Sequence, residues 1–192
     1  MKNTDRIKTI ILGVGNILLG DEGIGVHTIK KLTEEKLPHH ALIVDGSTAG
    51  FRLLTIFETY KNCKFIIIDA IKISYGATDS LIFSINTKNK KTIHQKGDIY
   101  LIPLSDLYNI TPSEYSSNDF ISFHQTGLMD VIKLFSLTHN VKISGYLIGV
   151  NIGEKDKAGN ETAFSVKLSP IITVSYTHLR AHETSLHLVC RL

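Results

Sequence analysis

Three residues of this chain combine side-chain chemistry and position in a way that suits a metal site: Glu22, Asp69 and His124. Glu22 follows the first apolar run, Asp69 directly follows a later one, and His124 opens a stretch with helical spacing. The carboxyl ends of neighbouring parallel strands share one edge of a sheet, so we expect the three to converge there. Two carboxylates and an imidazole suit Zn, Ni or Mn. Three protein ligands leave positions open for water or substrate, as in catalytic sites.

Each of these residues also has an ordinary structural role open to it. Glu22 could favour the positive end of the helix that follows it, Asp69 could bond the backbone after its strand, and His124 could be structural or exposed. The sequence has no Gly-x-Ser-x-Gly nucleophile elbow. Cys63 is expected just before a buried strand, with no candidate base nearby. Covalent catalysis is therefore disfavoured.

The elements that must position these residues alternate between strand and helix patterns. Short apolar runs predict strands at about 7–13, 41–44, 64–68, 80–85, 99–102 and 142–150. Helical spacing predicts helices at about 23–35, 49–59 and 124–137, with a further helix start at Ser169-Pro170. This alternation predicts an α/β fold, with a largely parallel sheet and helices on both faces.

A glycine-rich turn links the first strand to the first helix, and glycine allows both the tight turn and a close backbone approach. The turn reads Gly13-Val14-Gly15-Asn16-Ile17-Leu18-Leu19-Gly20-Asp21-Glu22-Gly23-Ile24-Gly25. It resembles the opening motif of the hydrogenase maturation endopeptidases, which trim the C-terminal extension from the large subunit of nickel–iron hydrogenases. Two later segments fit the same family, Asp45-Gly46-Ser47-Thr48-Ala49-Gly50 and Ser122-Phe123-His124-Gln125-Thr126-Gly127. The three matches are in order and cover most of residues 9 to about 170.

The resemblance implies both a fold and an activity. The fold would be a three-layer α/β/α domain with a twisted sheet of about five strands, mostly parallel, one antiparallel. The activity would be metal-dependent endoproteolysis, of the aspartic type, on a nickel–iron hydrogenase large-subunit precursor after nickel insertion. Glu22, Asp69 and His124 match the family's metal-binding residues and would be the catalytic residues here. The nickel would arrive with the precursor, and zinc or another divalent ion could take its place.

Two neighbouring features would support this site. Asp21 would be a backbone cap or a partner of the metal ligands. The turn that starts at Asp45 would shape the floor of the cleft and receive substrate backbone.

Two other functions remain open on the sequence alone. A non-catalytic chaperone or binding module that docks on hydrogenase could use the same cleft. A dinucleotide-binding enzyme is suggested by Gly13 and Gly15 after a strand and by Asp45 at the end of the next one. However, Leu18 stands where that fingerprint needs its third glycine, and the helix begins too late to meet a pyrophosphate.

The composition indicates an ordinary globular protein. The chain has 192 residues, of which 43% are hydrophobic and 20% charged, and its formal net charge is +3. We expect a single domain over residues 1–173, no nucleic-acid partner and a monomer. No apolar run approaches the roughly 20 residues that span a bilayer, so we expect no membrane partner. Met1 to Lys8 is polar, and we expect a cytoplasmic protein.

Residues 174–192 differ in character from the rest. They begin Val174-Ser175-Tyr176-Thr177-His178 and resemble the translation of a sequencing-library adapter. We therefore expect a non-native tail that cuts off the last helix after about Ile172. The histidines of this segment are accordingly given no role as metal ligands.

Overall fold

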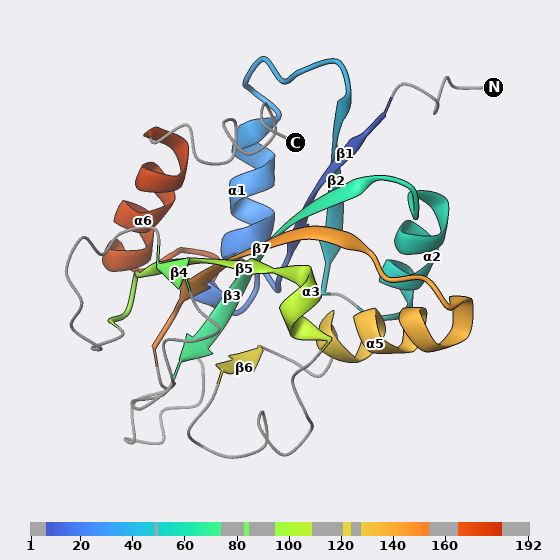
Figure 1. Ribbon diagram of the computed structural model, residues 1–192. Coiled ribbons are helices and arrows are strands. Elements are labelled where there is room, and N and C mark those ends of the chain that lie inside the picture. The colour runs from blue at the N-terminus through green and yellow to red at the C-terminus, as the bar shows by residue number, and fades with distance from the viewer. Residues whose placement is uncertain are drawn as a thin grey trace.

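The computed structural model describes residues 7–48, 50–73, 83–84, 95–108, 121–123, 128–153 and 165–181. Within them, helices cover both faces of one sheet (Figure 1). The strands are β1 (Thr9–Val14), β2 (Ala41–Ser47), β3 (Lys64–Ile73), β4 (Phe83–Ser84), β5 (Ile99–Pro103), β6 (Ile121–Phe123) and β7 (Ser144–Asn151). The helices are the 3-10 turn η2 (Gly20–Gly23), α1 (Ile24–Leu32), α2 (Phe51–Thr59), α3 (Leu104–Leu107), α5 (Leu128–His139) and α6 (Pro170–Ala181).

The sheet is mixed, and its centre is parallel. Its order is β2-β1-β3-β7-β5-β4, with β6 paired to β3. Strands β2, β1, β3 and β7 run parallel, whereas β5 is antiparallel to β7 and β4 to β5. Among the described residues, the five strands of at least five residues are β1, β2, β3, β5 and β7. The predicted fold class, a mostly parallel mixed sheet of about five strands between helical layers, is confirmed.

Two hydrophobic cores lie on the two faces of the sheet. Helices α1 and α6 cover one face, where Ile24 and Ile172 are completely buried. Helices α2, α3 and α5 cover the other face, where Phe57 and Phe135 are completely buried. Figure 1 shows these two groups of helices on opposite sides of the sheet.

The continuous apolar run at the start of β3 explains its central position. Phe65 and Ile67 belong to the core under α2 and α5, whereas Ile66 and Ile68 belong to the core under α1 and α6. All four side chains are fully buried. A strand with helices on both faces needs apolar residues at every position, so the period-two alternation of a half-exposed strand is missing.

Strand β3 is longer than the sequence predicts. The prediction took the apolar run to Ile68 and placed Asp69 at the end of the strand, which is wrong because β3 continues to Ile73. Strand β7 remains paired to it through Ile71, and β6 pairs with the last three residues. Asp69 therefore lies inside a paired strand, where Gly149 of β7 is its register partner.

The last helix starts where the sequence predicts. Helix α6 begins at Pro170 and runs to Ala181, so it crosses the predicted boundary of the non-native tail at residue 174. Ser175 is buried, while Val174 is exposed. The part of the tail that lies in α6 thus continues the native-looking helix start, and residues 182–192 lie outside the described part of the chain.

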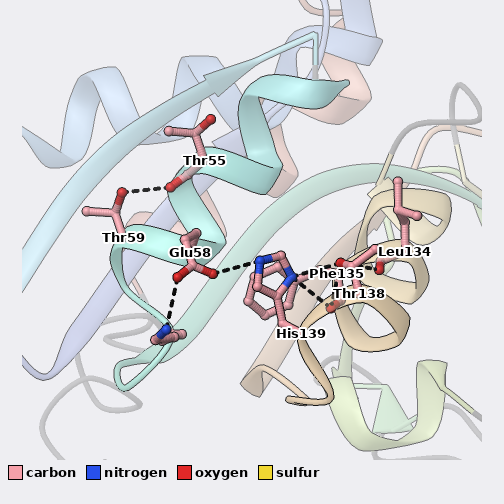
Figure 2. A network of polar contacts seen from close by, with 8 residues as sticks. Thr55, Glu58, Thr59, Leu134, Phe135, Thr138 and His139 are labelled. Atoms are coloured by element: carbon pink, nitrogen blue, oxygen red, sulfur yellow. Dashed lines mark hydrogen bonds and ion pairs between the residues drawn. The ribbon is translucent and has the colours of Figure 1, made fainter.

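A polar contact joins α2 to α5 at the protein surface. The Glu58 carboxylate lies 2.9 Å from His139 Nε2 and 2.9 Å from Lys61 Nζ. The His139 ring stacks on Phe135, with 4.4 Å between ring centroids (Figure 2).

Among the described residues, no helix is both long and apolar enough to cross a membrane.

Candidate active site

Two of the three predicted ligands meet at the carboxyl edge of the parallel strands. Glu22 lies in η2, the next element after β1, and Asp69 lies in β3, the neighbour of β1 in the sheet. The turn packs against β3, and the charge of Glu22 acts on the carboxyl group of Asp69. Both side chains are buried, with exposed fractions of 5% and 2%. The convergence predicted for this pair is confirmed.

Glycines let the turn close over the sheet. A Cβ atom at Gly25 would lie 2.2 Å from the carbonyl oxygens of both Val14 and Ile68. Gly15 has φ +141°, and a Cβ there would lie 2.1 Å from the carbonyl oxygen of Glu22. Only glycine permits these approaches, so the glycine spacing of the motif brings Glu22 over β3.

Burial dominates the electrostatics of this pair. It raises the pKa of Asp69 to about 8, because the charged form is poorly solvated, and the negative charge of Glu22 raises it further. The Ala70 N–H donates to Asp69 Oδ1 at 2.8 Å, which opposes the shift. Asp69 Oδ2 is buried without a hydrogen-bond partner among the described residues. A buried carboxylate in this state favours either a bound proton or a bound cation.

The donor set therefore fits a divalent cation. Two buried carboxylates offer hard oxygen ligands and up to two negative charges, which a cation would neutralise. No group of three His, Cys, Asp or Glu side chains that could hold a metal occurs within the described ranges. The predicted third ligand, His124, lies outside those ranges, so its role stays a prediction. The last described residue before it is Phe123, paired with Ile71 on β3.

The turn after β2 lies beside the turn after β1. Gly15 N–H donates to the Ser47 carbonyl oxygen at 2.8 Å. Asp45 Oδ1 accepts from Ser47 N–H at 2.8 Å and from Ser47 Oγ at 3.1 Å. The carboxylate of Asp45 is thereby engaged in shaping its own turn, which agrees with the structural role predicted for it. Receipt of substrate backbone by this turn stays a prediction.

Asp21 is held by two contacts, and the sequence identified neither partner. The Ser169 N–H donates to Asp21 Oδ1 at 2.6 Å, and Lys96 Nζ lies 2.7 Å from Asp21 Oδ2. Burial alone would raise the pKa of Asp21, but Lys96 and Ser169 outweigh it, and the pKa lies below its usual value. The prediction that Asp21 caps backbone is confirmed for Ser169. Lys96 was missed because it stands in a polar loop, far from Asp21 in sequence.

The described cysteine offers no nucleophile. Cys63 is buried, and its thiol donates to the Ile7 carbonyl oxygen at 3.3 Å. Burial raises the pKa of this thiol, which lowers its thiolate fraction. The expectation that Cys63 lies just before a buried strand is confirmed, since β3 begins at Lys64.

Comparison with known proteins places this site in context. No family model matches the chain. The hydrogenase 2 maturation protease of Escherichia coli (strain K12) is 31% identical over 145 residues, which cover 75% of this chain and 73% of that protein. The hydrogenase expression/formation protein HupD of Rhodobacter capsulatus is 29% identical over 115 residues, covering 55% of this chain. That match spans 53% of HupD, about half its length.

A solved structure shares the fold. The hydrogenase maturating endopeptidase HybD from Escherichia coli superposes with a TM-score of 0.56 and 24% sequence identity, and the match covers 94% of each chain. This match shows the fold, and the relationship to the hydrogenase 2 maturation protease of Escherichia coli, at 31% identity over 75% of this chain, shows the family. This chain belongs to the hydrogenase maturation protease family.

Proposed function

We propose that this chain is an endopeptidase that removes the C-terminal extension of a nickel–iron hydrogenase large-subunit precursor after nickel insertion. The observation that carries this proposal is the buried pair of Glu22 and Asp69, at the sheet edge of a chain from a protease family. The relatives are described as proteases and endopeptidases, which favours cleavage over docking alone. The glycine fingerprint of a dinucleotide site remains incomplete at Leu18.

In this proposal, Glu22, Asp69 and His124 hold one divalent cation. The support is the cost of burying the Asp69 carboxylate, which a cation would offset by supplying opposite charge. Nickel reaches these ligands as part of the loaded precursor, and zinc or another divalent ion can occupy the same positions. A bound divalent cation polarises a carbonyl oxygen or lowers the pKa of a water molecule.

The two carboxylates can also manage protons. The raised pKa of Asp69, about 8, favours its protonated form at neutral pH in the cation-free protein, and the negative charge of the neighbouring Glu22 favours that form further. A group whose pKa lies near the working pH can both accept and release a proton. Two carboxyl groups that share one proton are the working unit of aspartic proteases. This arrangement supports the aspartic-type part of the proposal, in which the pair transfers the protons of peptide hydrolysis.

The setting of the reaction completes the proposal. We place the enzyme in the cytoplasm as a monomer that meets the precursor transiently. The small net charge of +3 supports a protein partner rather than a nucleic acid. Light scattering coupled to size-exclusion chromatography gives the molecular mass and tests the monomer directly.

The decisive experiment is a cleavage assay on purified large-subunit precursor, with and without nickel. We expect a short C-terminal peptide to be lost from the nickel-loaded precursor only, followed as a change in mass. Equal cleavage of the precursor with and without nickel would support the peptidase activity and contradict nickel insertion as the signal for cleavage. Binding of the precursor without any cleavage would contradict the peptidase and favour the docking module.

Variants of the predicted ligands locate the activity. Glu22→Gln, Asp69→Asn and His124→Ala should each lower the cleavage rate by about 100-fold or more, the scale of a lost acid–base group. Glu34→Gln is the matched control, since it changes an exposed carboxylate that pairs with Lys31 on the surface. Full activity in all three ligand variants would refute the site.

A further inference from the structure

The turn that carries Glu22 has little internal support. The residue before η2, Leu19, makes no side-chain cap. Two backbone bonds of the turn are long, at 3.3 Å from Glu22 N–H to the Leu19 oxygen and 3.2 Å from Asn16 N–H to the Glu22 oxygen, whereas Leu19 N–H donates to the Asn16 oxygen at 3.0 Å. The turn therefore depends on contacts with other segments to keep the buried Glu22 carboxylate in place.

Asp21 provides those contacts from the position next to Glu22. One of its carboxylate oxygens accepts from Ser169 N–H at 2.6 Å, and the other lies 2.7 Å from Lys96 Nζ. The Asp21 side chain is 15% exposed, so solvent screens this ion pair less than a surface pair. Another hydrogen bond, from Gly20 N–H to the Ser165 carbonyl oxygen, fixes the start of the turn to the segment before α6 that also contains Ser169.

Helix α6 contacts the segments that carry both partners of Asp21, Ser169 and Lys96. Ser169 is the residue before the helix, and Ile171 in its first turn contacts the loop at Gly97; Ser175, from the predicted non-native tail, adds a bond from its Oγ to the Gly97 carbonyl oxygen at 2.6 Å. A Cβ at Gly97 would lie 2.8 Å from both Ile171 Cγ2 and Ser175 Oγ, so the helix packs directly on the loop that contains Lys96. The contacts form a closed ring from η2 through Lys96 and α6 back to η2.

We propose that Asp21 is a positioning residue for Glu22, and that Lys96 and helix α6 hold it in place. The proposal rests on the proposed function only in taking Glu22 as a working carboxylate. Asp69 belongs to a strand paired on both sides, whereas Glu22 belongs to a turn, so loss of the Asp21 contacts displaces one carboxylate relative to the other. A displacement of about 1 Å at a catalytic group can lower the rate by about 100-fold.

The test compares Lys96→Met with Lys96→Arg in the full chain. Lys96→Met removes the charge that holds Asp21, whereas Lys96→Arg restores a cation of similar reach. Lys31→Met is the matched control, because it removes one positive charge from an exposed pair with Glu34 on α1. For each variant we measure the dissociation constants of Ni²⁺ and Zn²⁺ by calorimetry, kcat and KM for precursor cleavage, and the melting temperature.

A positioning role predicts a particular split among these measurements. Lys96→Met should weaken ion binding and lower kcat by about 10-fold or more, with KM within about threefold of the wild type. Lys96→Arg should recover most of the loss, and Lys31→Met should match the wild type. A Lys96→Met variant with a lower melting temperature but unchanged ion affinity and kcat would overturn the proposal, as would failure of Lys96→Arg to recover any function.

The same measurements separate this proposal from the proposed function. A wild-type chain that binds ions but cleaves nothing contradicts the peptidase, and the ion affinities alone then decide the role of Asp21. If the wild-type chain cleaves the precursor but does not bind free ions, the ratio of kcat between Lys96→Met and the wild type decides the role of Asp21. A wild-type chain that does neither contradicts both proposals.

Discussion

Two carboxylates of this chain experience opposite environments. Glu58, at the end of α2, is exposed and lies 2.9 Å from both Lys61 and His139 (Figure 2). The hydrogen bond from Lys61 is the main reason why the pKa of Glu58 lies below its usual value. Asp69, in the central strand β3 at the carboxyl edge of the parallel strands, is buried, and its pKa rises to about 8. The surface partners of Glu58 stabilise its negative charge, whereas burial opposes the negative charge of Asp69.

The difference indicates which of these two carboxylates is an ordinary surface group and which one serves the site. Glu58 obeys the ordinary rule that a surface charge pairs with opposite charges, and its loss would cost little. Asp69 breaks the rule that a buried strand position is apolar, although its neighbours Ile68 and Ala70 follow it. Violations of this kind are expected at functional sites, where stability is lost in exchange for chemistry.

The largest effect concerns the stability of the cation-free protein as a function of pH. Because the folded pKa of Asp69 lies above its unfolded value, the folded state binds more protons between about pH 4 and pH 8. The contribution of Asp69 to the unfolding free energy is therefore greatest below pH 4 and decreases as pH rises towards 8. We expect a total decrease on the order of 6 kcal/mol from a rise of about four pKa units. Asp69→Asn should remove this decrease and be the more stable protein at pH 8.

Urea denaturation in the presence of a chelator, at several pH values, measures this dependence. Asp130→Asn on the exposed side of α5 is the control, and it should keep the wild-type pH dependence. Addition of Ni²⁺ or Zn²⁺ at pH 8 should stabilise the wild type more than Asp69→Asn. Identical pH profiles for the wild type and Asp69→Asn would show that the burial of this carboxylate carries no cost.

Two glycines give the next comparison: Gly25, in α1 beside the site, and Gly50, just before α2 on the other face of the sheet. Gly25→Ala should destabilise by about 3 kcal/mol and abolish cleavage, because its Cβ would meet two backbone oxygens at 2.2 Å. Gly50→Ala should cost only about 1 kcal/mol, since nothing lies within 4 Å and the cost is the strain of φ +77°. Thermal and urea unfolding of both variants measure the ranking. Equal losses of unfolding free energy in the two variants would mean that the close packing of α1 on β1 and β3 adds nothing to the cost of Gly25→Ala.

The sequence predicts the parts of this fold that depend on local pattern. The apolar run of β3, the helix start at Pro170 and the glycine-rich turn at Gly13 each carry their signal in adjacent residues. The pairing of Glu22 with Asp69 was also predictable, because neighbouring parallel strands end at one edge. These predictions required no knowledge of contacts between distant segments.

The features that were missed depend on such distant contacts. Strand β3 extends past Asp69 because β7 and β6 continue to pair with it, and those partners come more than 45 residues later in the chain. The Lys96 partner of Asp21 lies in a loop whose sequence has no regular pattern. His124 was selected for its side-chain chemistry, its position and its match to the family motif, and it lies outside the described residues. Its part in the site therefore depends on the variant experiments.

The smallest effect is expected where a carboxylate serves only the surface. Glu58→Gln removes the ion pairs with Lys61 and His139, yet solvent already screens them, so the melting temperature should change by less than about 2 °C near neutral pH. Because the folded pKa of Glu58 is lowered, even this small difference should disappear as pH falls through that pKa. Cleavage should be unchanged. Differential scanning calorimetry and the precursor assay measure both, and a loss of activity in Glu58→Gln would mean that the α2–α5 contact, as well as the buried pair, is coupled to function.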